Sequence, residues 1–277
     1  MYANSQKAFA LAAPACAAAR RPLIWHLHDI LSAGHFGAGQ RALTVGLANR
    51  WAARVIVPSL AAARAFVAAG GRERLLRVVP NGLDGDASGP AAPLDLPYPF
   101  VFGVFSRLAP WKGQEVALRA LTGLPGVGCV IVGGALFGEE AYARSLRTLA
   151  AELGVAERVR FLGHRDDVPA LMRAVHAVVH PSTEPEPFGR TLVEAMLTRR
   201  PVVAAHAGAV PEILDEGRVG LLVPPGDPSA LVVALGRIRA GEGSGMLDGA
   251  EARARWLYSA ERMRAGIQGV VAETIPA

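Results

Sequence analysis

Two cationic side chains, Arg107 and Lys112, lie five residues apart in the segment SRLAPWKG (106–113). An apolar run precedes this segment and a helical pattern follows it, so both cations are expected in a loop between a strand and a helix. Guanidinium groups bind phosphate through a planar fork, and an ammonium acts as a compact point charge. Together they would suit a diphosphate. A solvated pair of loop cations is the alternative, although only Lys7 and Lys112 are lysine among 29 lysine and arginine residues.

Two glutamates, Glu186 and Glu194, are separated by seven residues in the segment EPEPFGRTLVEAM (184–196). The pattern places Glu186 in a loop and Glu194 in the second turn of a helix. The main-chain N–H groups of Gly189–Leu192 would then lie free at the helix N-terminus, where an anion is stabilised. Carboxylates on either side could accept hydrogen bonds from sugar hydroxyls. The simpler alternative is that Glu186 only favours the helix dipole.

Three further loops follow expected strands. Gly133–Gly134, after GCVIVG, would allow a ligand or the backbone to come close, or would form a tight turn. His164–Arg165, after RVRFLG, could meet a nucleotide base, although simple solvent exposure is the alternative. His28–Asp29, after LIWHLH, could orient a histidine for proton chemistry or could be structural. His26 on the same strand is a candidate core residue.

Several function classes find no support in the sequence. Histidine, cysteine and aspartate nowhere show the spacing of metal ligands, and there is no P-loop and no G-x-S-x-G. Gly126 and Gly128 precede a strand rather than follow one, which argues against a Rossmann dehydrogenase. Cys16 and Cys129 cannot form a disulfide framework, which favours a reduced cytoplasmic setting. A net charge of +5 favours acidic partners such as nucleotide phosphates, anionic lipid headgroups or nucleic acid.

Short apolar runs alternate with helical patterns along most of the chain. Strands separated by helices and apolar on both faces predict doubly wound parallel sheets, which bind ligands beyond the carboxyl ends of their strands. The segment 81–99, rich in Gly, Pro and Asp, is the expected linker. The expected strands are 23–28, 54–58, 77–80, 100–106, 128–133, 158–163, 177–181, 201–205 and 220–224. The expected helices are 36–52, 59–69, 113–122, 139–153, 166–174, 189–198, 210–215, 227–240 and 248–272.

Two apolar segments could be mistaken for targeting or membrane segments. Residues 8–19 have the length of a signal-peptide core, but the positive region before them is thin, and an alanine-rich helix is favoured. Residues 120–138 carry no charge, yet their glycines and Pro125 predict a loop, a strand and a loop rather than a spanning helix.

The ordered set of motifs resembles family 4 of the retaining glycosyltransferases. The resemblance is highly specific over about residues 75–232 and less so for LIWHLHD (23–29) and RVIVPS (54–59). Its matching segments are VVPNGLD (78–84), FSRLAPWKG (105–113), VIVGG (130–134), RVRFLGHRDDVPALM (158–172), VVHPSTEPEPFGRTLVEAM (178–196), RPVVAAHAGAVPEIL (200–214) and VGLLVPPGDPSAL (219–231).

This resemblance implies a GT-B fold of two Rossmann-like domains, and transfer of a sugar from a UDP- or GDP-linked donor to a saccharide or lipid-linked acceptor. Retention of configuration, no obligatory metal and no cofactor are implied as well. Arg107 and Lys112 would neutralise the diphosphate and the leaving group. Glu186 would contact the sugar, Glu194 the ribose, and His28 would lie near sugar and acceptor. The catalytic set is Glu186, Lys112, Arg107 and His28, and the donor-binding set is Gly133, Gly134, His164, Arg165, Phe188, Gly189, Arg190, Thr191, Leu192 and Glu194.

The expected domains are a partial acceptor-side domain over 1–95, a nucleotide-sugar-binding domain over 96–258, and a C-terminal helix over 259–277 that packs back toward the first domain. Family members usually begin earlier, so Met1 is expected inside a mid-domain helix and the first domain is expected to be incomplete. We expect a cytoplasmic protein without a nucleic-acid partner, and the basic balance favours peripheral binding at an anionic membrane. A truncated, non-catalytic nucleotide-sugar-binding module is the alternative function. A sugar-nucleotide epimerase is disfavoured by the paired glutamates and by SRLAPWKG.

Overall fold

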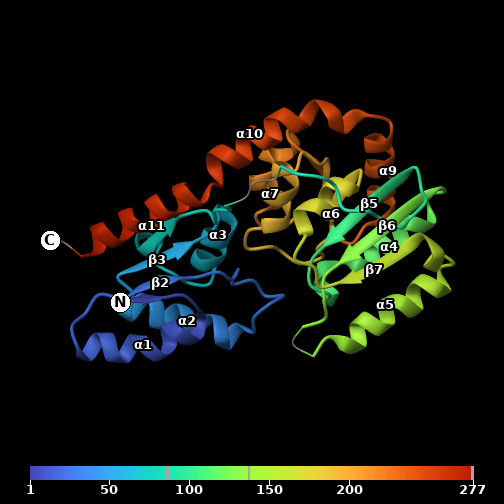
Figure 1. Ribbon diagram of the computed structural model, residues 1–277. Coiled ribbons are helices and arrows are strands. Elements are labelled where there is room, and N and C mark those ends of the chain that lie inside the picture. Colours follow the sequence, from blue (N-terminus) through green and yellow to red (C-terminus); the bar gives the residue numbers. More distant parts are fainter. Residues whose placement is uncertain (85–87, 137, 276–277) are drawn as a thin grey trace. The chain divides into compact units, whose positions relative to one another are not determined.

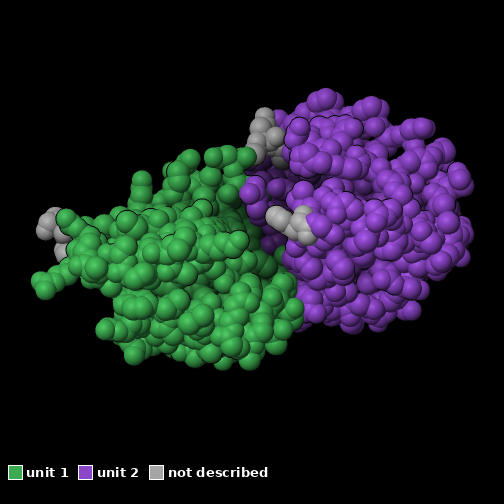
Figure 2. Space-filling view, turned by 90° about the horizontal axis from the view of Figure 1, so that it is seen from below, with its two compact units in different colours: residues 1–84, 185–188, 257–277 green, residues 85–184, 189–256 purple. Residues whose placement is uncertain are grey.

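The computed structural model describes residues 1–84, 88–136 and 138–275. Contacts between residues divide the chain into two units, coloured separately in Figure 2. Unit 1 consists of Met1–Asp84, Pro185–Phe188 and Leu257–Ala277, and unit 2 of Gly85–Glu184 and Gly189–Trp256. Residues 185–188 therefore cluster with unit 1, although both of their flanks belong to unit 2.

Unit 1 is built on a four-stranded parallel sheet in the order β1-β2-β3-β4. A helix connects each of these strands to the next one, as crossovers between parallel strands require. Its elements are β1 (Tyr2–Ala3), α1 (Gln6–Ala18), β2 (Ile24–His26), α2 (Ala38–Trp51), β3 (Arg54–Val57), α3 (Leu60–Ala68), the 3-10 turn η1 (Glu73–Leu75), β4 (Leu76–Val78) and the C-terminal α11 (Ala260–Thr274).

The side chains of β2 and β3 alternate between the two faces of this sheet, as strand geometry dictates. On one face Trp25 stacks on Phe9 of α1 and packs edge-on against Phe66 of α3. On the other face Ile24 and Ile56 pack with residues of α11, and Figure 1 shows α11 and α1 on opposite sides of β2 and β3. Burying a large apolar side chain contributes about 1.5–3 kcal/mol, so the aromatic residues of one face and the isoleucines of the other both stabilise unit 1.

The start of the chain differs from the prediction. Residues 2 and 3 form β1, which pairs in parallel with Ile24 and Trp25, and α1 begins only at Gln6. Ser5 caps the helix by accepting a 3.1 Å hydrogen bond from the N–H of Ala8. The expectation that Met1 lies inside a helix is therefore wrong, because a two-residue strand is too short to show periodicity and is defined by its pairing. The alanine-rich helix itself is confirmed.

Unit 2 is built on a six-stranded parallel sheet in the order β10-β9-β8-β5-β6-β7. Read from the other edge, this is the strand order of a Rossmann sheet. Its elements are β5 (Phe100–Phe105), η2 (Pro110–Lys112), α4 (Gln114–Thr122), β6 (Val127–Val132), α5 (Glu140–Glu152), η3 (Ala156–Arg158), β7 (Val159–Gly163), α6 (Val168–Ala174), β8 (Ala177–His180), α7 (Arg190–Leu197), β9 (Val202–Ala205), α8 (Val210–Ile213), η4 (Asp215–Gly217), β10 (Leu221–Val223), α9 (Pro228–Arg239), η5 (Glu242–Met246) and α10 (Leu247–Leu257).

The strands of this second sheet are covered on both faces. All residues of β5 and β6 are buried, which explains their continuous apolar runs. One core cluster joins Phe102, Ile131 and their neighbours on one face to Leu118 of α4, Leu146 of α5 and Leu235 of α9. Helix α7 packs on β8 and β9. The doubly wound parallel architecture predicted from the sequence is thereby confirmed.

The C-terminal helical stretch, expected as one helix over 248–272, is divided into α10 and α11. The break falls at Tyr258–Ser259, where the Ser259 hydroxyl caps α11 by accepting from the N–H of Arg262 at 3.3 Å. Ser259 also forms a bridge with Leu83 of the same unit. The prediction of one continuous helix is therefore wrong. It could not show the break, because the apolar spacing continues across the serine that caps α11.

Candidate functional site

The order of strands in unit 2 reverses between β5 and β8. The chain runs outward from β5 to β6 and β7, then returns to β8 beside β5 and continues to β9 and β10. Loops that leave two neighbouring strands in opposite directions open a crevice at the carboxyl edge of a parallel sheet. The loop after β5 carries Arg107 and Lys112, and the segment after β8 leads to Thr191. The topology therefore brings these two predicted segments to one edge of the sheet.

Both predicted cations lie against the ring of Trp111. The guanidinium of Arg107 is 5.5 Å from the ring centroid, and the ammonium of Lys112 is 4.1 Å from it. Contacts of this kind stabilise a cation by about 0.5–1 kcal/mol when exposed and by more when desolvated. Arg107 also donates a 2.7 Å hydrogen bond from Nη1 to Oε2 of Glu139. The loop thus holds two positive charges around one aromatic ring, with one carboxylate beside Arg107.

Gln114, the first residue of α4, secures the loop that carries these cations. Its side chain is fully buried, and Nε2 donates 2.9 Å hydrogen bonds to the Ser106 hydroxyl and to the main-chain carbonyl of Arg107. The hydroxyl of Tyr142 donates to the Gln114 carbonyl oxygen at 3.2 Å. Burial, with smaller effects of nearby groups, raises the pKa of Tyr142 to about 12, so it remains a donor at neutral pH. The Arg107 backbone is therefore fixed by a buried polar network.

Two glycines let the surrounding loops approach at backbone distance. Gly113 has a φ of 71°, and a Cβ there would lie 1.9 Å from the carbonyl oxygen of Pro181. Gly133 has a φ of 143°, and its Cβ would lie 1.9 Å from the carbonyl oxygen of Ser106. No side chain fits at either position. The loop after β5 is thus packed directly against the loops after β6 and β8.

The remaining loop residues are placed as follows. Gly133 donates its N–H to the carbonyl of Gly163 at 2.8 Å. A Cβ on Gly134 would meet that of His164 at 3.8 Å, so the glycine pair and the end of β7 lie side by side. The His164 side chain is 84% exposed. The guanidinium of Arg165 is bound to Asp167 instead, through two hydrogen bonds of 2.8 and 2.7 Å.

The N-terminus of α7 carries no side-chain cap. Gly189, at the cap position, has a φ of 99° that glycine adopts without strain. The first N–H groups of the helix, at Arg190 and Thr191, are thus left for water or an anion. Glu194 lies one turn on, 4.0 Å from Arg190. Burial raises the pKa of Glu194, and Arg190 partly offsets that effect.

The two other residues predicted in this segment, Glu186 and Phe188, are buried within unit 1. The ring of Phe188 meets that of Tyr258 edge-on at 5.4 Å. The Ser59 hydroxyl donates a 2.7 Å hydrogen bond to the carbonyl of Pro187. Residues 185–188 are therefore held by side chains of unit 1, whereas Gly189–Glu194 belong to unit 2.

His28 lies at the carboxyl end of β2 in a separate polar cluster of unit 1. Its Nε2 is 2.7 Å from Oδ1 of Asn4, which can only accept, so Nε2 carries the proton and Nδ1 is the acceptor. The ring of His26 lies 4.0 Å away, centroid to centroid, and Nδ1 of His26 is hydrogen bonded to the Tyr2 hydroxyl. Burial lowers the pKa of His28, with Asp29 opposing, and burial and His28 lower that of His26 to about 4. Both histidines are neutral at pH 7.

Several residues of these sites were missed from the sequence. Trp111, Glu139 and Gln114 organise the cationic loop, and the buried His180 and Ser182 lie at the end of β8, 3.3 Å apart. Only Gln114 had a usable signal, because it shares the buried helical face of Ala117, Leu118 and Leu121. A polar side chain on such a face requires a buried partner.

Within residues 1–84, 88–136 and 138–275, no three His, Cys, Asp or Glu side chains are grouped to hold a metal ion. Across the same residues, no helix has both the length and the apolar character that a membrane crossing needs.

Comparison with known sequences gives two family matches. Residues 96–263 match the family described as Glycosyl transferases group 1, and residues 2–87 match Glycosyltransferase Family 4. The chain is 35% identical over 196 residues to a D-inositol 3-phosphate glycosyltransferase of Mycolicibacterium gilvum, covering 68% of this chain and 44% of that protein. A protein of the same name from Corynebacterium jeikeium is 36% identical over 181 residues, which cover 59% of this chain and 43% of the relative. The chain thus spans less than half the length of these relatives.

Solved structures agree with this result. The chain is 41% identical to Anabaena Alr3699/HepE, solved in complex with UDP and glucose, with a TM-score of 0.92 over 98% of this chain and 77% of that one. The same Anabaena protein was also solved with UDP-glucose. Sucrose-phosphate synthase of Thermosynechococcus elongatus, at 22% identity and a TM-score of 0.88, shares the fold over 98% of this chain and 72% of its own.

Proposed function

The chain belongs to the family Glycosyl transferases group 1, and we propose that it transfers a sugar from a nucleotide-diphospho-sugar to an acceptor with retention of anomeric configuration. Membership confirms the resemblance that the motifs predicted, and the neighbouring structures confirm the GT-B fold. The activity, the donor and the acceptor of this chain are proposals, since it covers only part of its curated relatives.

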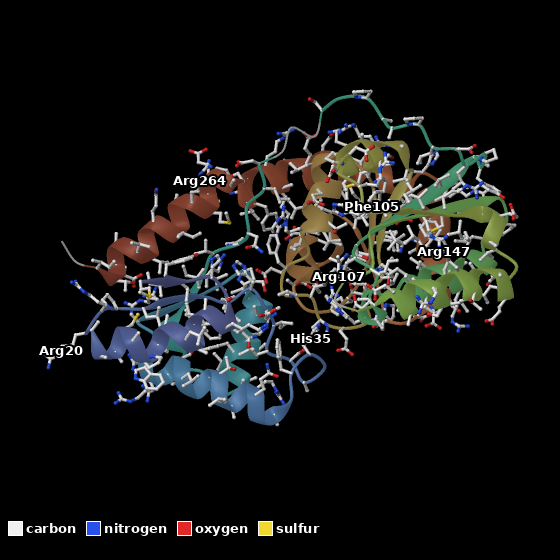
Figure 3. The ribbon with its side chains drawn as sticks, turned by 60° about the horizontal axis from the view of Figure 1, so that its bottom comes forward. Arg20, His35, Phe105, Arg107, Arg147 and Arg264 are labelled. Atoms are coloured by element: carbon white, nitrogen blue, oxygen red, sulfur yellow. The ribbon has the colours of Figure 1, made fainter. Side chains whose placement is uncertain are left out.

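One observation carries the proposal: two cations and an uncapped helix N-terminus meet at the switch point of the sheet in unit 2. Arg107 and Lys112 lie around Trp111 after β5. The Thr191 hydroxyl ties the first turn of α7 to the carbonyl of Phe105, at the end of the same strand. Figure 3 labels Phe105 and Arg107, which bound this junction. A diphosphate could therefore meet guanidinium, ammonium and main-chain N–H groups at once.

The same groups fit the chemistry of transfer. When the bond between the anomeric carbon and the diphosphate oxygen breaks, its electron pair stays with the nucleotide, and negative charge grows on the leaving phosphate. Cations and N–H groups fixed in advance stabilise that charge without reorganising. The acceptor oxygen forms the new bond to carbon and releases its proton. From the family motif we assign a hydrogen bond with the ribose to Glu194, whose pKa is raised by burial, and contacts with the sugar to Glu186 and His28.

We propose UDP rather than GDP as the nucleotide. The basis is the Anabaena protein, which is 40% identical to this chain and was solved with UDP-glucose. Titration calorimetry with UDP and with GDP, on the full chain, tests the choice. Binding of GDP with affinity equal to or higher than that of UDP would reject it.

Turnover of UDP-glucose, as hydrolysis or as transfer to an acceptor panel, tests the catalytic claim. Lys112→Ala is expected to lower kcat/KM by about a hundredfold, the loss of one charge-stabilising donor. Lys7→Ala is the matched control, because Lys7 is the other lysine of the chain and is exposed on α1. Equal turnover by both variants would reject the assignment of Lys112. NMR of the anomeric proton of the product decides between retention and inversion.

UDP binding without turnover on any acceptor would favour the alternative function, a non-catalytic nucleotide-sugar-binding module.

We propose a saccharide or lipid-linked acceptor, and peripheral binding to anionic membrane as a consequence of the net charge of +5. Sedimentation with vesicles containing phosphatidylserine should bring down the protein at low salt and leave it in solution at high salt. Equal recovery at both salt concentrations would contradict the membrane proposal.

A further inference from the structure

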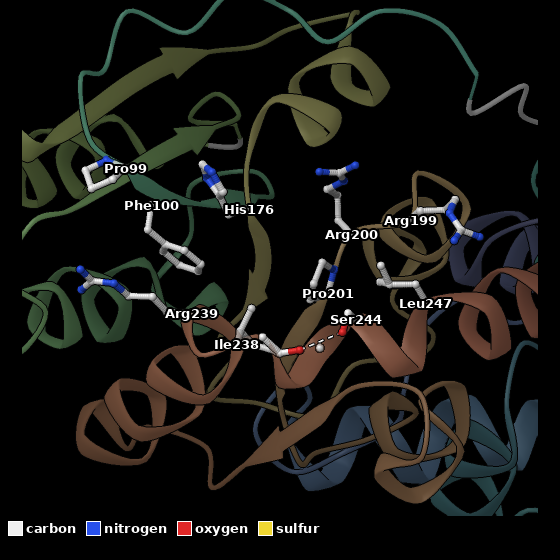
Figure 4. Close-up of a pocket in the computed structure, with 12 residues that line it drawn as sticks. Pro99, Phe100, His176, Arg199, Arg200, Pro201, Ile238, Arg239, Ser244 and Leu247 are labelled. Atoms are coloured by element: carbon white, nitrogen blue, oxygen red, sulfur yellow. Dashed lines mark hydrogen bonds between the residues drawn. The ribbon is translucent and has the colours of Figure 1, made fainter.

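Unit 2 has an open pocket at the amino edge of its sheet, opposite the loops that carry the candidate donor site. The pocket has a volume of about 420 Å³, within the range of small-molecule sites. It lies where β5 and β9 begin, at Phe100 and Pro201, and α9 and η5 complete its wall (Figure 4). Because β5 has six residues of about 3.3 Å each, roughly 20 Å separate this pocket from the loop after Phe105.

The pocket combines an apolar floor with cationic and hydrogen-bonding walls. Figure 4 shows Phe100 and His176 next to each other on one side of the pocket and Arg200 on the other side. The rings of Phe100 and His176 stack, with centroids 5.2 Å apart. Nδ1 of His176 accepts a 3.0 Å hydrogen bond from the N–H of Val101, so Nε2 of the neutral ring carries the proton and can donate. No aspartate or glutamate is among its described lining residues.

Arg200 is the half-buried cation of this pocket. Its hydrogen bonds go to two main-chain carbonyls, those of Thr198 at 3.3 Å and Val175 at 3.4 Å. Among the described residues no carboxylate lies at ion-pair distance from it. A guanidinium has five N–H donors, so further donors of Arg200 are available to a ligand. Burial, then the charges of Arg173 and Arg199, lower its pKa, which marks a region of positive potential.

The neighbouring Arg199 has a different role. Its guanidinium is bound to Asp248 and Glu251 of α10, at 2.7 Å each. Its φ is 55°, a left-handed conformation at the end of α7 where glycine is usual. That backbone costs about 1–2 kcal/mol in a residue with a side chain, and the two ion pairs hold it there. Arg199 thus fixes the chain immediately before Arg200.

The wall formed by η5 is equally constrained. A Cβ on Gly243 would lie 2.9 Å from Cδ1 of Ile238 and 2.9 Å from Cβ of Pro201. A residue with a side chain would not fit at position 243, so the turn packs closely against Ile238 and Pro201. Ser244 on the same turn is exposed and donates its hydroxyl to the carbonyl of Gly241 at 2.9 Å. The pocket is consequently shaped by packed backbone on this side.

We propose that this pocket is a second ligand site of the protein, which binds a small phosphate monoester with a ring. The phosphate would contact Arg200 and the Nε2–H of His176, and the ring would lie on Phe100. Phosphate is favoured over a carboxylate because Arg200 carries a half-buried charge that no acidic side chain of the described lining neutralises. Helix α7 begins at the candidate donor site and ends at Leu197, two residues before Arg199, so one helix connects the two sites.

Titration calorimetry with phenyl phosphate tests the proposal on the full chain saturated with UDP, which keeps the probe out of the nucleotide site. Phenyl phosphate is expected to bind more tightly than inorganic phosphate, which lacks the ring, and than benzoate, which carries a single charge. Arg200→Gln should weaken binding about tenfold, the loss of one charged hydrogen bond. Arg237→Gln is the control, because Arg237 lies on α9 outside the pocket and is paired with Glu242.

Ser244→Glu provides an independent variant should Arg200→Gln fail to fold. It places a carboxylate on an exposed lining position and should weaken phenyl phosphate binding at least as strongly, while inorganic phosphate and UDP serve as references. Absence of phenyl phosphate binding to the UDP-saturated chain, or unchanged affinity in Ser244→Glu, would each overturn the proposal. These results do not depend on turnover, so they are separate from the test of the transferase activity.

Discussion

The Thr191 hydroxyl donates a 3.0 Å hydrogen bond to the main-chain carbonyl of Phe105. This bond joins the first turn of α7 to the last residue of β5, although the two residues are far apart in sequence. The cationic loop starts two residues after Phe105, and the uncapped N–H groups of α7 lie at Thr191 and the residue before it. This side-chain contact inside unit 2 therefore links the strand that precedes the cationic loop to the N-terminus of α7.

Thr191→Val removes that contact while keeping the shape of the side chain. The free energy of unfolding should fall by about 1 kcal/mol, and the affinity for UDP by about tenfold, because the helix N-terminus is no longer fixed to the strand. Chemical denaturation and calorimetry measure the two effects. Thr122→Val is the control, since the Thr122 hydroxyl donates to the carbonyl of Arg119 in its own helix. Equal UDP affinity in the two variants would show that the Thr191 bond does not position the site.

Gly133→Ala should disrupt the junction between the loops after β5 and β6. The new Cβ would overlap the carbonyl oxygen of Ser106 at 1.9 Å, and the φ of 143° is unfavourable for alanine. A loss of stability on the order of 2–4 kcal/mol is expected, with loss of UDP binding. Gly126→Ala separates the steric overlap from the unfavourable φ. Gly126 also has a positive φ, 68°, but a Cβ added there would have no atom within 4 Å. Thermal unfolding of both variants makes the comparison, and a similar drop in Tm would show that backbone strain alone matters.

Much of the architecture followed from local sequence patterns. Strands such as β6, buried along its whole length, produce apolar runs that stand out between amphipathic helices. Loops at strand ends follow from the same pattern, and the sequence therefore predicts that Arg107 and Lys112 lie in such a loop. Strand β1 escaped detection because two residues carry no period, and only pairing with Ile24 and Trp25 makes them a strand.

Contacts between distant segments could not be predicted in this way. The pairing of Arg107 with Glu139 spans 32 residues and has no local signature. Residues 185–188 contact unit 1 through Ser59 and Tyr258, which are far apart in the sequence. Local patterns indicate which residues are buried or form turns, but they do not indicate which distant side chain contacts each of these residues.

Arg107→Gln and Glu139→Gln, taken together, distinguish phosphate binding from a structural ion pair. The paired side chains are 29% and 21% exposed, so each variant should change stability by no more than about 1 kcal/mol. If Arg107 holds the diphosphate, Arg107→Gln should reduce UDP affinity about tenfold or more. Glu139→Gln should keep or raise that affinity, because it removes a competing carboxylate. An equal fall in both variants, measured by calorimetry, would assign Arg107 a purely structural role.

Acid should destabilise the protein through His26. Burial, and then the neighbouring His28, lower its pKa from 6.5 to about 4, and its Nδ1 is hydrogen bonded to the Tyr2 hydroxyl. Between these two values the unfolded chain binds a proton that the folded protein excludes. The stability associated with neutral His26 is therefore complete above pH 6.5 and is lost progressively as the pH falls toward 4. The depression of the pKa corresponds to about 3 kcal/mol.

Denaturant unfolding at pH 7, 6 and 5 measures this effect, and NMR titration of the imidazole signals follows His26 directly. His26→Gln should reduce the dependence of stability on pH in this range, leaving the smaller contribution of His28. His164→Gln is the matched control, because the His164 side chain is 84% exposed. That control should keep the slope of the unmodified protein. If His26→Gln and His164→Gln show the same slope, neutral buried His26 does not govern the acid sensitivity of unit 1.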